Sequence, residues 1–488
     1  MSIATEQQAV VDTVPKELYI GGEWRPASGG ERFAVEDPAT GEALCEIADA
    51  TPDDAVAALD AAVAAQADWA TTPPNERGEI LWRAFESLRE LTDDLALLMT
   101  LEMGKSLAES KAEIAYSAEF FRWFSGEALR IGGEYKVAGN AQSRVLVMRQ
   151  PVGPSFFITP WNFPMAMGTR KVGPAIAAGC TMVWKPAQLT PLSALALTAL
   201  LDDAGLPPGV LNIVTSSSSA SIAAPVISDP RLRKLSFTGS TEVGRKLIEQ
   251  SAENVLKVSM ELGGNAPFLI FDDADLDAVL AGAMLAKMRN IGEACTAANR
   301  FHVAAPIADQ FASRLAERMD ALTVGRGTEE GTDVGPLINE DQRSKVAELV
   351  EDAIGRGARA VVGGRAIDGA GYFYEPTVLG GVTPDARVLK EEIFGPVAPV
   401  VPFDSEEAAI AAANDTDYGL VAYVFTRDLK RALRVCEGLE TGMVGLNQGM
   451  VSNAGAPFGG VKQSGIGREG GSEGIDEYLE TKYVAVNL

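Results

Sequence analysis

Histidine is almost absent from this sequence of 488 residues, which contains one, His302. Metal sites built on several histidines are therefore excluded, and acid–base chemistry by histidine is disfavoured. Cysteine is also sparse, since Cys45, Cys180, Cys295 and Cys436 lie far apart and follow no CxxC or metal-binding spacing. We expect no metal site, and we expect reduced thiols of the kind found in the cytoplasm.

Basic charge and long apolar runs are lacking as well. The 42 Lys and Arg residues are outnumbered by 67 Asp and Glu residues, which gives a formal charge of −25. Nucleic acids and anionic membranes attract basic surfaces, so neither is an expected partner. No apolar run approaches the roughly 18 residues of a membrane helix, and residues 1–14 lack an export signal pattern. We therefore expect a cytoplasmic protein.

The first third of the chain combines short strands with long helices. Residues 19–50 alternate apolar runs with turns, and Thr51-Pro52-Asp53-Asp54 has the hydroxyl cap, proline and acids of a helix N-terminus. Helices are expected from there to about Ile131. A buried stripe at helical spacing is predicted for Ile80, Leu81, Ala84, Leu88, Leu91 and Leu95. Core aromatics are predicted at Trp82, Phe120, Phe121, Trp123 and Phe124.

From Pro151 onward, strands alternate with helices. The β-rich runs are SFFIT, TMVW, LNIV, KLSF and VLKVSM. This alternation predicts a doubly wound parallel sheet, which binds ligands at the carboxyl ends of its strands. A second alternating region follows at about 267–460, with helices near 273–290, 307–322, 341–355, 405–414 and 428–437.

A carboxylate and a thiol stand 34 residues apart in the segment Val258–Arg300, as Glu261 and Cys295. A thiol attacks only as thiolate, so it needs a lowered pKa or a nearby base, and Glu261 is the candidate base. The alternative is that Cys295 is inert core and Glu261 is solvated surface, which are the commoner situations of these residue types.

Three turns after predicted strands carry further candidates. In PWNFP, Asn162 has a restrained amide that can donate to an oxyanion, although Asn is also a common turn residue. Lys185 follows TMVW, where a ribose or phosphate would lie in such a sheet. Gly239 and Ser240 open a helix suited to a diphosphate, but the GxGxxG pattern is missing, and simple helix capping is the commoner reason for such residues when they are taken alone.

Taken in order, PWNFP, WKPA, FTGSTEVG, MELGG, GEAC, EEIFGP and PFGGVKQSGIGRE resemble the aldehyde dehydrogenase superfamily over nearly the whole chain. The resemblance implies that Cys295 attacks the aldehyde carbon while the Asn162 side chain and the Cys295 backbone N–H hold the oxyanion. Hydride then leaves to a nicotinamide, and Glu261 activates the water that hydrolyses the thioester. Glu469 matches a second carboxylate assigned to proton relay.

The resemblance also implies cofactor contacts, at Trp161, Lys185, Gly239, Ser240, Glu392 and Phe394. Gln188 stands where an acidic residue would repel a 2′-phosphate, so NADP is permitted and NAD is not excluded. The run Ser216–Ser219 departs from the glycine usual near the adenine.

The implied fold is α/β in three parts. Residues 1–131 and 151–261 form a Rossmann-like NAD(P)-binding domain, and residues 262–460 form the catalytic domain. Residues 132–150 and 472–488 form a small β oligomerisation arm, which implies a homodimer or homotetramer. The C-terminal strand can join the sheet of another subunit or an edge within its own chain.

The substrate side resembles the semialdehyde branch of the superfamily, in particular its succinate-semialdehyde members. Arg170, Arg289 and Ser452 match residues that bind the far carboxylate of the substrate, and guanidiniums suit such an anion. Ordinary salt-bridged arginines are the alternative. The prediction is oxidation of succinic semialdehyde, with 2-oxoglutaric or glutaric semialdehyde as the alternative. Ala297 replaces a second cysteine found in many such enzymes, so a local redox switch is not expected.

A cysteine esterase and a catalytically retired scaffold are the two alternatives from other functional classes. A cysteine esterase needs only a thiol and a base, and would work without a cofactor. A catalytically retired scaffold would typically have lost the nucleophile or the base, whereas Cys295, Glu261 and Asn162 are all present.

Overall fold

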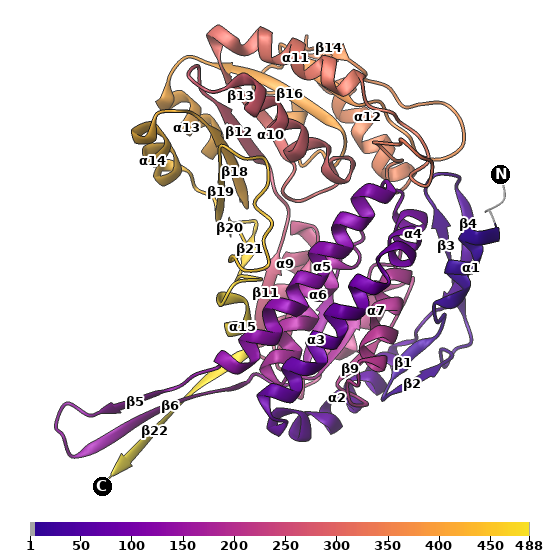
Figure 1. The fold of residues 1–488 in the computed structure, drawn as a ribbon, viewed down its shortest axis with the longest axis vertical. Coiled ribbons are helices and arrows are strands. Elements are labelled where there is room, and N and C mark those ends of the chain that lie inside the picture. The colour runs from indigo at the N-terminus through magenta and orange to yellow at the C-terminus, as the bar shows by residue number, and fades with distance from the viewer. Residues whose placement is uncertain (1–4, 488) are drawn as a thin grey trace.

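Two large sheets covered by helices, and a narrow arm of three strands, organise the chain (Figure 1). The computed structural model describes residues 5–487, so the first four residues of the predicted cofactor-binding part and Leu488 lie outside the described residues. The α/β class with parallel sheets is confirmed. Within residues 5–487 no helix combines the length and the hydrophobicity needed to cross a bilayer.

The first sheet has eight strands in the order β2-β1-β9-β8-β7-β10-β11-β21. Its bounds are β1 Leu18–Ile20, β2 Glu23–Arg25, β7 Ser155–Ile158, β8 Met182–Lys185, β9 Leu211–Ile213, β10 Lys234–Thr238, β11 Lys257–Glu261 and β21 Gly465–Ile466. The five central strands are parallel because helices connect them, namely α6 Ala166–Ala178, α7 Leu192–Asp203, α8 Ser219–Ile227 and α9 Thr241–Ser251. All five are strands that the sequence predicts.

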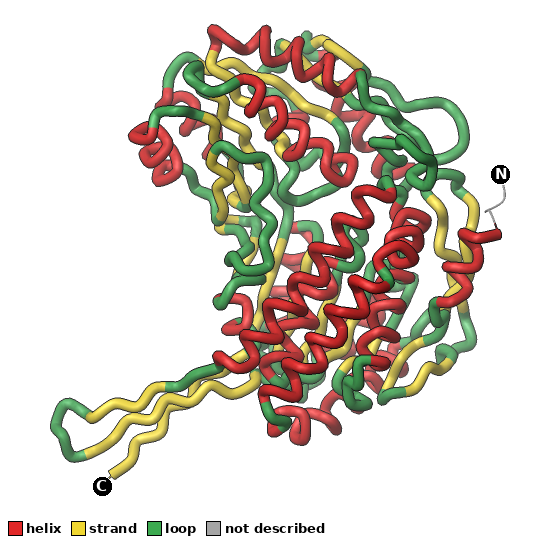
Figure 2. The backbone as a smooth tube through the Cα atoms, viewed as in Figure 1, coloured by secondary structure: helices red, strands yellow, loops and turns green. Residues whose placement is uncertain are grey.

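Helices from the N-terminal third pack beside this sheet (Figures 1 and 2). They are α1 Thr5–Thr13, α2 Pro52–Thr71, α3 Pro74–Glu90, α4 Thr92–Met103 and α5 Leu107–Glu127, with the 3-10 turn η1 Ala128–Arg130 and the ribbon of β3 Arg32–Asp37 and β4 Glu42–Ala48. The predicted start of α2 is confirmed, since Thr51 and Asp54 form a capping box.

Two predicted core positions are wrong. Leu91 is 45% exposed because the chain turns there between α3 and α4, so the buried stripe does not continue through it. Trp82 is also 45% exposed, since it follows the fully buried Leu81 and points to the outer side of α3. Phe120, Phe121 and Phe124 are buried as predicted.

The second sheet has seven strands in the order β14-β15-β16-β13-β12-β18-β19. Its bounds are β12 Ala266–Ile270, β13 Ala298–Ala304, β14 Arg359–Val362, β15 Thr377–Gly380, β16 Val397–Phe403, β18 Val421–Phe425 and β19 Met443–Leu446. The five predicted helices are present as α10 Leu276–Met288, α11 Ala308–Asp320, α12 Glu340–Gly355, α13 Glu406–Asn414 and α14 Leu429–Gly438. Short elements complete this part, namely η2 Arg289–Gly292, η3 Ala305–Ile307, η4 Arg387–Leu389, β17 Tyr418–Gly419, β20 Val461–Lys462 and α15 Glu473–Asp476.

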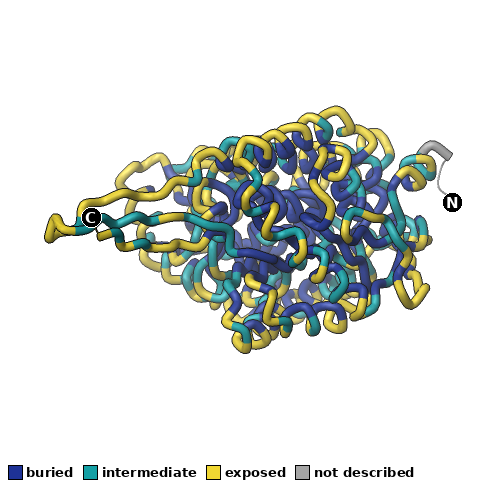
Figure 3. The backbone as a smooth tube through the Cα atoms, turned by 90° about the horizontal axis from the view of Figure 1, so that it is seen from below, coloured by how far each residue is buried: buried dark blue, intermediate teal, exposed yellow. Residues whose placement is uncertain are grey.

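The arm consists of β5 Glu134–Val137, β6 Ser143–Pro151 and β22 Leu479–Asn487. The C-terminal strand β22 pairs antiparallel with β6 along its whole length, from Leu479 opposite Pro151 to Asn487 opposite Ser143. Of the two alternatives for this strand, the intrachain edge is therefore the one observed. The arm projects from the body, and most of its backbone is exposed or half-buried (Figures 1 and 3).

Candidate active site

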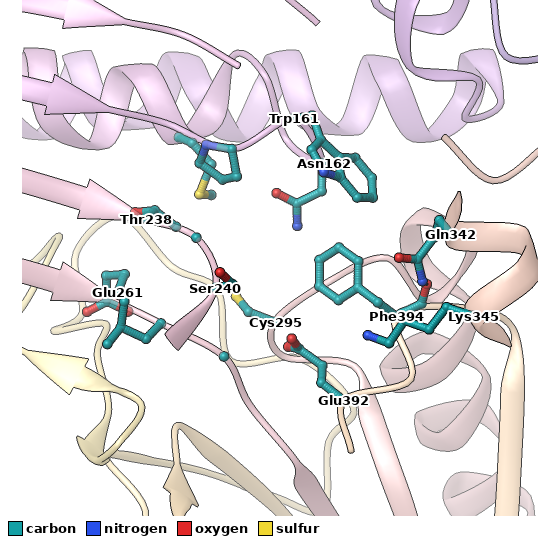
Figure 4. A pocket seen from close by; sticks show the side chains of 15 residues that line it. Trp161, Asn162, Thr238, Ser240, Glu261, Cys295, Gln342, Lys345, Glu392 and Phe394 are labelled. Carbon is teal, nitrogen blue, oxygen red and sulfur yellow. The ribbon is translucent and has the colours of Figure 1, made fainter. Parts of the chain in front are cut away.

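The carboxyl ends of β10 and β11 open into a pocket of about 210 Å³ (Figure 4). Thr238 and Glu261 end these two parallel strands in register, so both side chains reach the same edge of the sheet. The pocket is lined by Pro160, Trp161, Asn162, Met167, Thr238, Gly239, Ser240, Glu261, Leu262, Gly263, Cys295, Gln342, Lys345, Glu392 and Phe394. It thus joins the predicted nucleophile, base and oxyanion donor with five of the predicted cofactor contacts.

Cys295 reaches the pocket from a strained turn. Asn290, Ile291 and Gly292 have φ values of 54°, 62° and 79°, a left-handed run that costs about 1–3 kcal/mol for each residue other than glycine. A Cβ added at Gly292 would lie 2.3 Å from the Gly395 carbonyl oxygen. Burial raises the pKa of the Cys295 thiol to about 12, and Arg170 opposes this rise. The thiol is therefore protonated until a base or a cation acts on it.

Glu261 is a buried carboxylate at the end of β11. Neither carboxylate oxygen has a hydrogen-bond partner among the described residues. Burial, together with the charge of Glu469, raises its pKa well above the usual range. The Glu261 charge also raises the pKa of Cys295, so the two groups lie close enough to interact. An unpaired buried carboxylate is costly, and here both oxygens are free to accept a proton from a thiol or a water.

Asn162 is held in a network of buried hydrogen bonds. Its Nδ2 donates to the Glu293 carbonyl oxygen at 3.0 Å. The backbone carbonyl oxygen of Asn162 accepts from Lys105 Nζ at 2.8 Å and from Asn290 Nδ2 at 3.0 Å. One Nδ2 hydrogen is left for a further acceptor, so the amide is positioned to bind an oxyanion in the pocket.

Sequence reasoning missed the ion pair behind this network. Lys105 Nζ lies 2.5 Å from Glu113 Oε2, and both side chains are buried. Glu113 Oε1 accepts from the backbone N–H groups of Met165 and Ala166, at 3.0 and 3.1 Å, at the start of α6. No sequence signal identifies this pair as buried, because its partners come together only through the packing of α5 against α6.

Five predicted cofactor contacts line the pocket, namely Trp161, Gly239, Ser240, Glu392 and Phe394. Gly239 and Ser240 precede α9, and the Ser240 side chain caps that helix by accepting from Val243 N at 3.4 Å. Trp161 and Phe394 meet edge to face, with ring centroids 5.4 Å apart. The helix-capping explanation of Ser240 is thus realised, and the backbone N–H groups at this helix start still face the pocket side of the sheet.

Glu392 is a second buried carboxylate in the same pocket. Its Oε1 accepts from Gly264 N at 3.1 Å, and burial raises its pKa to about 6. The Thr238 hydroxyl is buried without a hydrogen-bond partner among the described residues. Ribose hydroxyls need such acceptors and a diphosphate needs a helix N-terminus, so the groups present fit a nicotinamide dinucleotide.

Lys185 and Gln188 lie outside this pocket lining. Lys185 Nζ donates to Ser219 Oγ at 2.6 Å, and burial lowers its pKa to about 8. Gln188 is exposed and lines a separate hollow. In the serine run, Ser216 Oγ donates to Asp49 Oδ1 at 2.9 Å. The serines thus tie the start of α8 to the N-terminal part of the chain, next to Lys185.

Arg170 is ion-paired rather than free. Its Nε lies 2.8 Å from Glu469 Oε2, and Lys171 Nζ donates to Glu469 Oε1 at 2.6 Å. The Arg170 guanidinium also stacks on the Phe458 ring at 3.8 Å. Arg170 is 2% exposed and is absent from the pocket lining. For this residue the geometry is that of the salt-bridged alternative, and Glu469 is its partner.

Arg289 has the opposite arrangement. Its Nη1 donates to Ser452 Oγ at 3.3 Å, and its guanidinium lies over the Phe163 ring at 4.7 Å. Within residues 5–487 no salt-bridge partner is found for it. The structure therefore brings two of the three predicted substrate contacts together, although neither lines the catalytic pocket. Arg289 lines a neighbouring hollow with Ala294 and Thr296, the two residues on either side of Cys295, and most of its donors remain free.

His302 and the other cysteines play no part in this site. His302 is buried in β13, and burial lowers its pKa to about 3, so it is neutral. All four cysteines are free. The described residues include no group of three or more His, Cys, Asp or Glu side chains that could hold a metal ion.

Comparison with known proteins agrees with this geometry. The model of the aldehyde dehydrogenase family matches residues 24–484. A succinate-semialdehyde dehydrogenase of Paenarthrobacter nicotinovorans is 57% identical over 91% of this chain and 98% of its own length. A glutarate-semialdehyde dehydrogenase of Pseudomonas putida is 49% identical over 97% of this chain and 98% of its own length.

Solved structures show the same fold. A crystal structure described as an E. coli NADP-dependent enzyme superposes with a TM-score of 0.96, at 50% identity, over 98% of this chain and 99% of that one. Betaine aldehyde dehydrogenase of Staphylococcus aureus in complex with NAD+ has a TM-score of 0.96 at 33% identity, over 99% of this chain and 97% of that one. With the family model and full-length relatives both matching, the chain belongs to the aldehyde dehydrogenase family.

Proposed function

We propose that this protein oxidises succinic semialdehyde to succinate, with NADP or NAD as hydride acceptor. Glutaric and 2-oxoglutaric semialdehyde are the alternative substrates. The observation that carries the proposal is Arg289, a half-buried guanidinium without an acidic partner among the described residues, bonded to Ser452 beside the Cys295 turn. A short aldehyde with a carboxylate at its far end would satisfy both Arg289 and Cys295.

The names of the relatives support this substrate class. Relatives at 57% and 49% identity are a succinate-semialdehyde and a glutarate-semialdehyde dehydrogenase. Both substrates join an aldehyde to a distal carboxylate. Arg170 is ion-paired with Glu469, so a direct contact with substrate would require it to leave that pair.

Four groups carry the chemistry in this proposal. Glu261 accepts the thiol proton of Cys295 through water, and the thiolate forms a bond to the aldehyde carbon. The resulting oxyanion is held by the Asn162 amide and the Cys295 backbone N–H. A nicotinamide held by the proposed cofactor contacts would supply the hydride acceptor needed to convert the Cys295 adduct into a thioester. After the first proton has passed from Glu261 to solvent, Glu261 takes a proton from the water that hydrolyses the thioester and returns it to the departing thiolate, which releases the acid and the free thiol.

The cofactor contacts proposed for this chain are Trp161, Lys185, Gly239, Ser240, Glu392 and Phe394. Gln188 carries no charge that would repel a 2′-phosphate, so NADP is accepted. We assign residues 1–131 and 151–261 to cofactor binding and residues 262–460 to catalysis.

We further propose a homodimer or homotetramer in the cytoplasm. Support comes from the arm, where Tyr135 and Tyr483 are 65% and 61% exposed. The arm sheet ends in the open strands β22 and β5, and the seven-stranded sheet ends in the open strand β19. Open edges with exposed apolar side chains are suited to pairing with a second subunit.

The proposal is tested by measuring kcat/KM for succinic, glutaric and 2-oxoglutaric semialdehyde and for butanal, each with both nucleotides. Succinic semialdehyde should give the highest value, and Arg289→Met should lower it by about 100-fold or more, since a charged hydrogen-bond pair is lost. A higher kcat/KM for butanal would contradict the proposed substrate class. Ester hydrolysis without any nucleotide-dependent absorbance change would favour the cysteine esterase instead.

A further inference from the structure

Tyr116 has a buried hydroxyl close to Ser452. The residue lies on α5, and its hydroxyl oxygen is buried without a hydrogen-bond partner among the described residues. A buried hydroxyl without a partner costs about 1–3 kcal/mol, so such groups are rare unless a ligand or water satisfies them. The function proposed above assigns Tyr116 no role.

The position of Tyr116 connects the nucleophile with the predicted anion site. Its ring packs against a small apolar cluster of Phe163, Ala166, Met167, Ala294 and Ala297. Ala294 and Ala297 flank Cys295 in sequence, and Met167 lines the catalytic pocket. Tyr116 therefore packs directly behind the residues that surround the nucleophile.

Two arginines lie over the paired rings of Tyr116 and Phe120. The Arg289 guanidinium carbon lies 5.9 Å from the Tyr116 ring centroid. The Tyr116 ring also meets Phe120 edge to face at 4.9 Å, and Arg170 lies 5.9 Å from that same Phe120 ring. Because Arg170 is paired with Glu469, Arg289 is the arginine near these rings whose N–H donors remain available for a ligand.

The phenol is kept in its neutral, donating form. Burial raises the pKa of Tyr116, and although Arg170, Arg289 and Ser452 all act to lower it, burial dominates. A neutral phenol donates one hydrogen bond and suits a carboxylate. Tyr116, Arg289 and Ser452 would then offer an anion donors from three different elements of the chain.

We propose that Tyr116 is a specificity-determining residue that donates a hydrogen bond to the far carboxylate of the substrate, alongside Arg289 and Ser452. The inference rests on the proposed oxidation of an aldehyde with a distal anion. It assigns to α5 a direct part in substrate selection, beyond the role of its Glu113 in positioning α6.

The test is Tyr116→Phe, which keeps the ring and removes the hydroxyl. For succinic semialdehyde, kcat/KM should fall about tenfold, mainly through a higher KM, as expected for one lost hydrogen bond to a charged group. For butanal, which has no carboxylate, kcat/KM should stay within about twofold. The matched control is Tyr483→Phe on the exposed arm, which should change neither value.

A second measurement separates recognition from packing. The inhibition constant of succinate, the expected product, should rise by a similar factor in Tyr116→Phe, while the melting temperature should stay the same or rise because a buried hydroxyl is removed. Equal losses for succinic semialdehyde and butanal, or no loss for either, would overturn the role of Tyr116. Wild-type preference for butanal would instead overturn the proposed function itself, so the two failures are distinguishable.

Discussion

The Arg170 guanidinium lies 2.8 Å from the Glu469 carboxylate, and both side chains are buried next to the proposed base. Lys171 binds the other oxygen of Glu469. The Glu469 charge raises the pKa of Glu261, while Arg170 and Lys171 lower it. This cluster therefore tunes the ionisation of Glu261, which burial alone would leave protonated over a wide pH range.

Substitution Glu469→Gln tests this tuning. Removing the negative charge should lower the pKa of Glu261, so the acid limb of the kcat/KM profile should move to lower pH. Two buried cations also lose their partner, and stability should fall by about 3–5 kcal/mol, measured by urea unfolding. Glu473→Gln, an exposed neighbour, is the control. An acid limb that stays in place would contradict the coupling.

Substitutions of Cys295 and Glu261 should block different steps of the reaction. Cys295→Ala should abolish dehydrogenase activity with the fold intact, and substantial remaining turnover would rule out the mechanism. Glu261→Gln should allow some acylation but little hydrolysis. Rapid mixing should then show a burst of reduced nucleotide, up to one equivalent per site, followed by a slow phase. A slow reaction without a burst would mean that the loss of Glu261 slows thiolate formation as much as it slows hydrolysis of the thioester.

Asn162→Ala removes one oxyanion donor. The expected loss in kcat is about 10²- to 10³-fold, with a small change in KM, because the interaction strengthens only as charge develops on the oxygen. Steady-state kinetics with succinic semialdehyde provide the measurement. The buried contacts of the Asn162 carbonyl with Lys105 and Asn290 use the backbone and should persist, so circular dichroism should be unchanged.

Glu293 should make the free energy of unfolding depend on pH. Its side chain is fully buried, and burial raises its pKa well above the usual range. The folded protein thus keeps this proton to higher pH than the unfolded chain, so its contribution to stability falls as pH rises above about 4.5, the ordinary carboxyl pKa. Glu293→Gln should remove this decline and become the more stable form at alkaline pH. Parallel unfolding curves of both proteins across pH would contradict this.

Ala297 predicts resistance to reversible oxidation. Without a second cysteine two residues after Cys295, peroxide should not form a local disulfide there. Mass spectrometry of the peroxide-treated protein should find no intrachain disulfide at Cys295. Ala297→Cys is the comparison variant, since its activity should be lost on treatment with mild peroxide and restored by thiol. The same recovery through an intrachain disulfide in wild type would refute the prediction.

Strand and helix positions follow well from local pattern, because alternation and capping are local properties. The five central strands of the first sheet and the capping box at Thr51 illustrate this. The stripe predicted to include Leu91 is wrong for the converse reason: helical spacing says nothing about where the chain turns from α3 into α4.

The sequence alone determined the α/β class, the family and the residue types of the site. The order of the motifs and the spacing of Glu261 and Cys295 are properties of the linear sequence. Only the tertiary structure decided which charges are free. Arg170 and Arg289 look alike in the sequence, yet Arg170 is neutralised by Glu469 and Arg289 is not. The burial of the Tyr116 hydroxyl is likewise visible only in the tertiary structure. Pairing between distant buried groups depends on packing in three dimensions, and no local pattern encodes it.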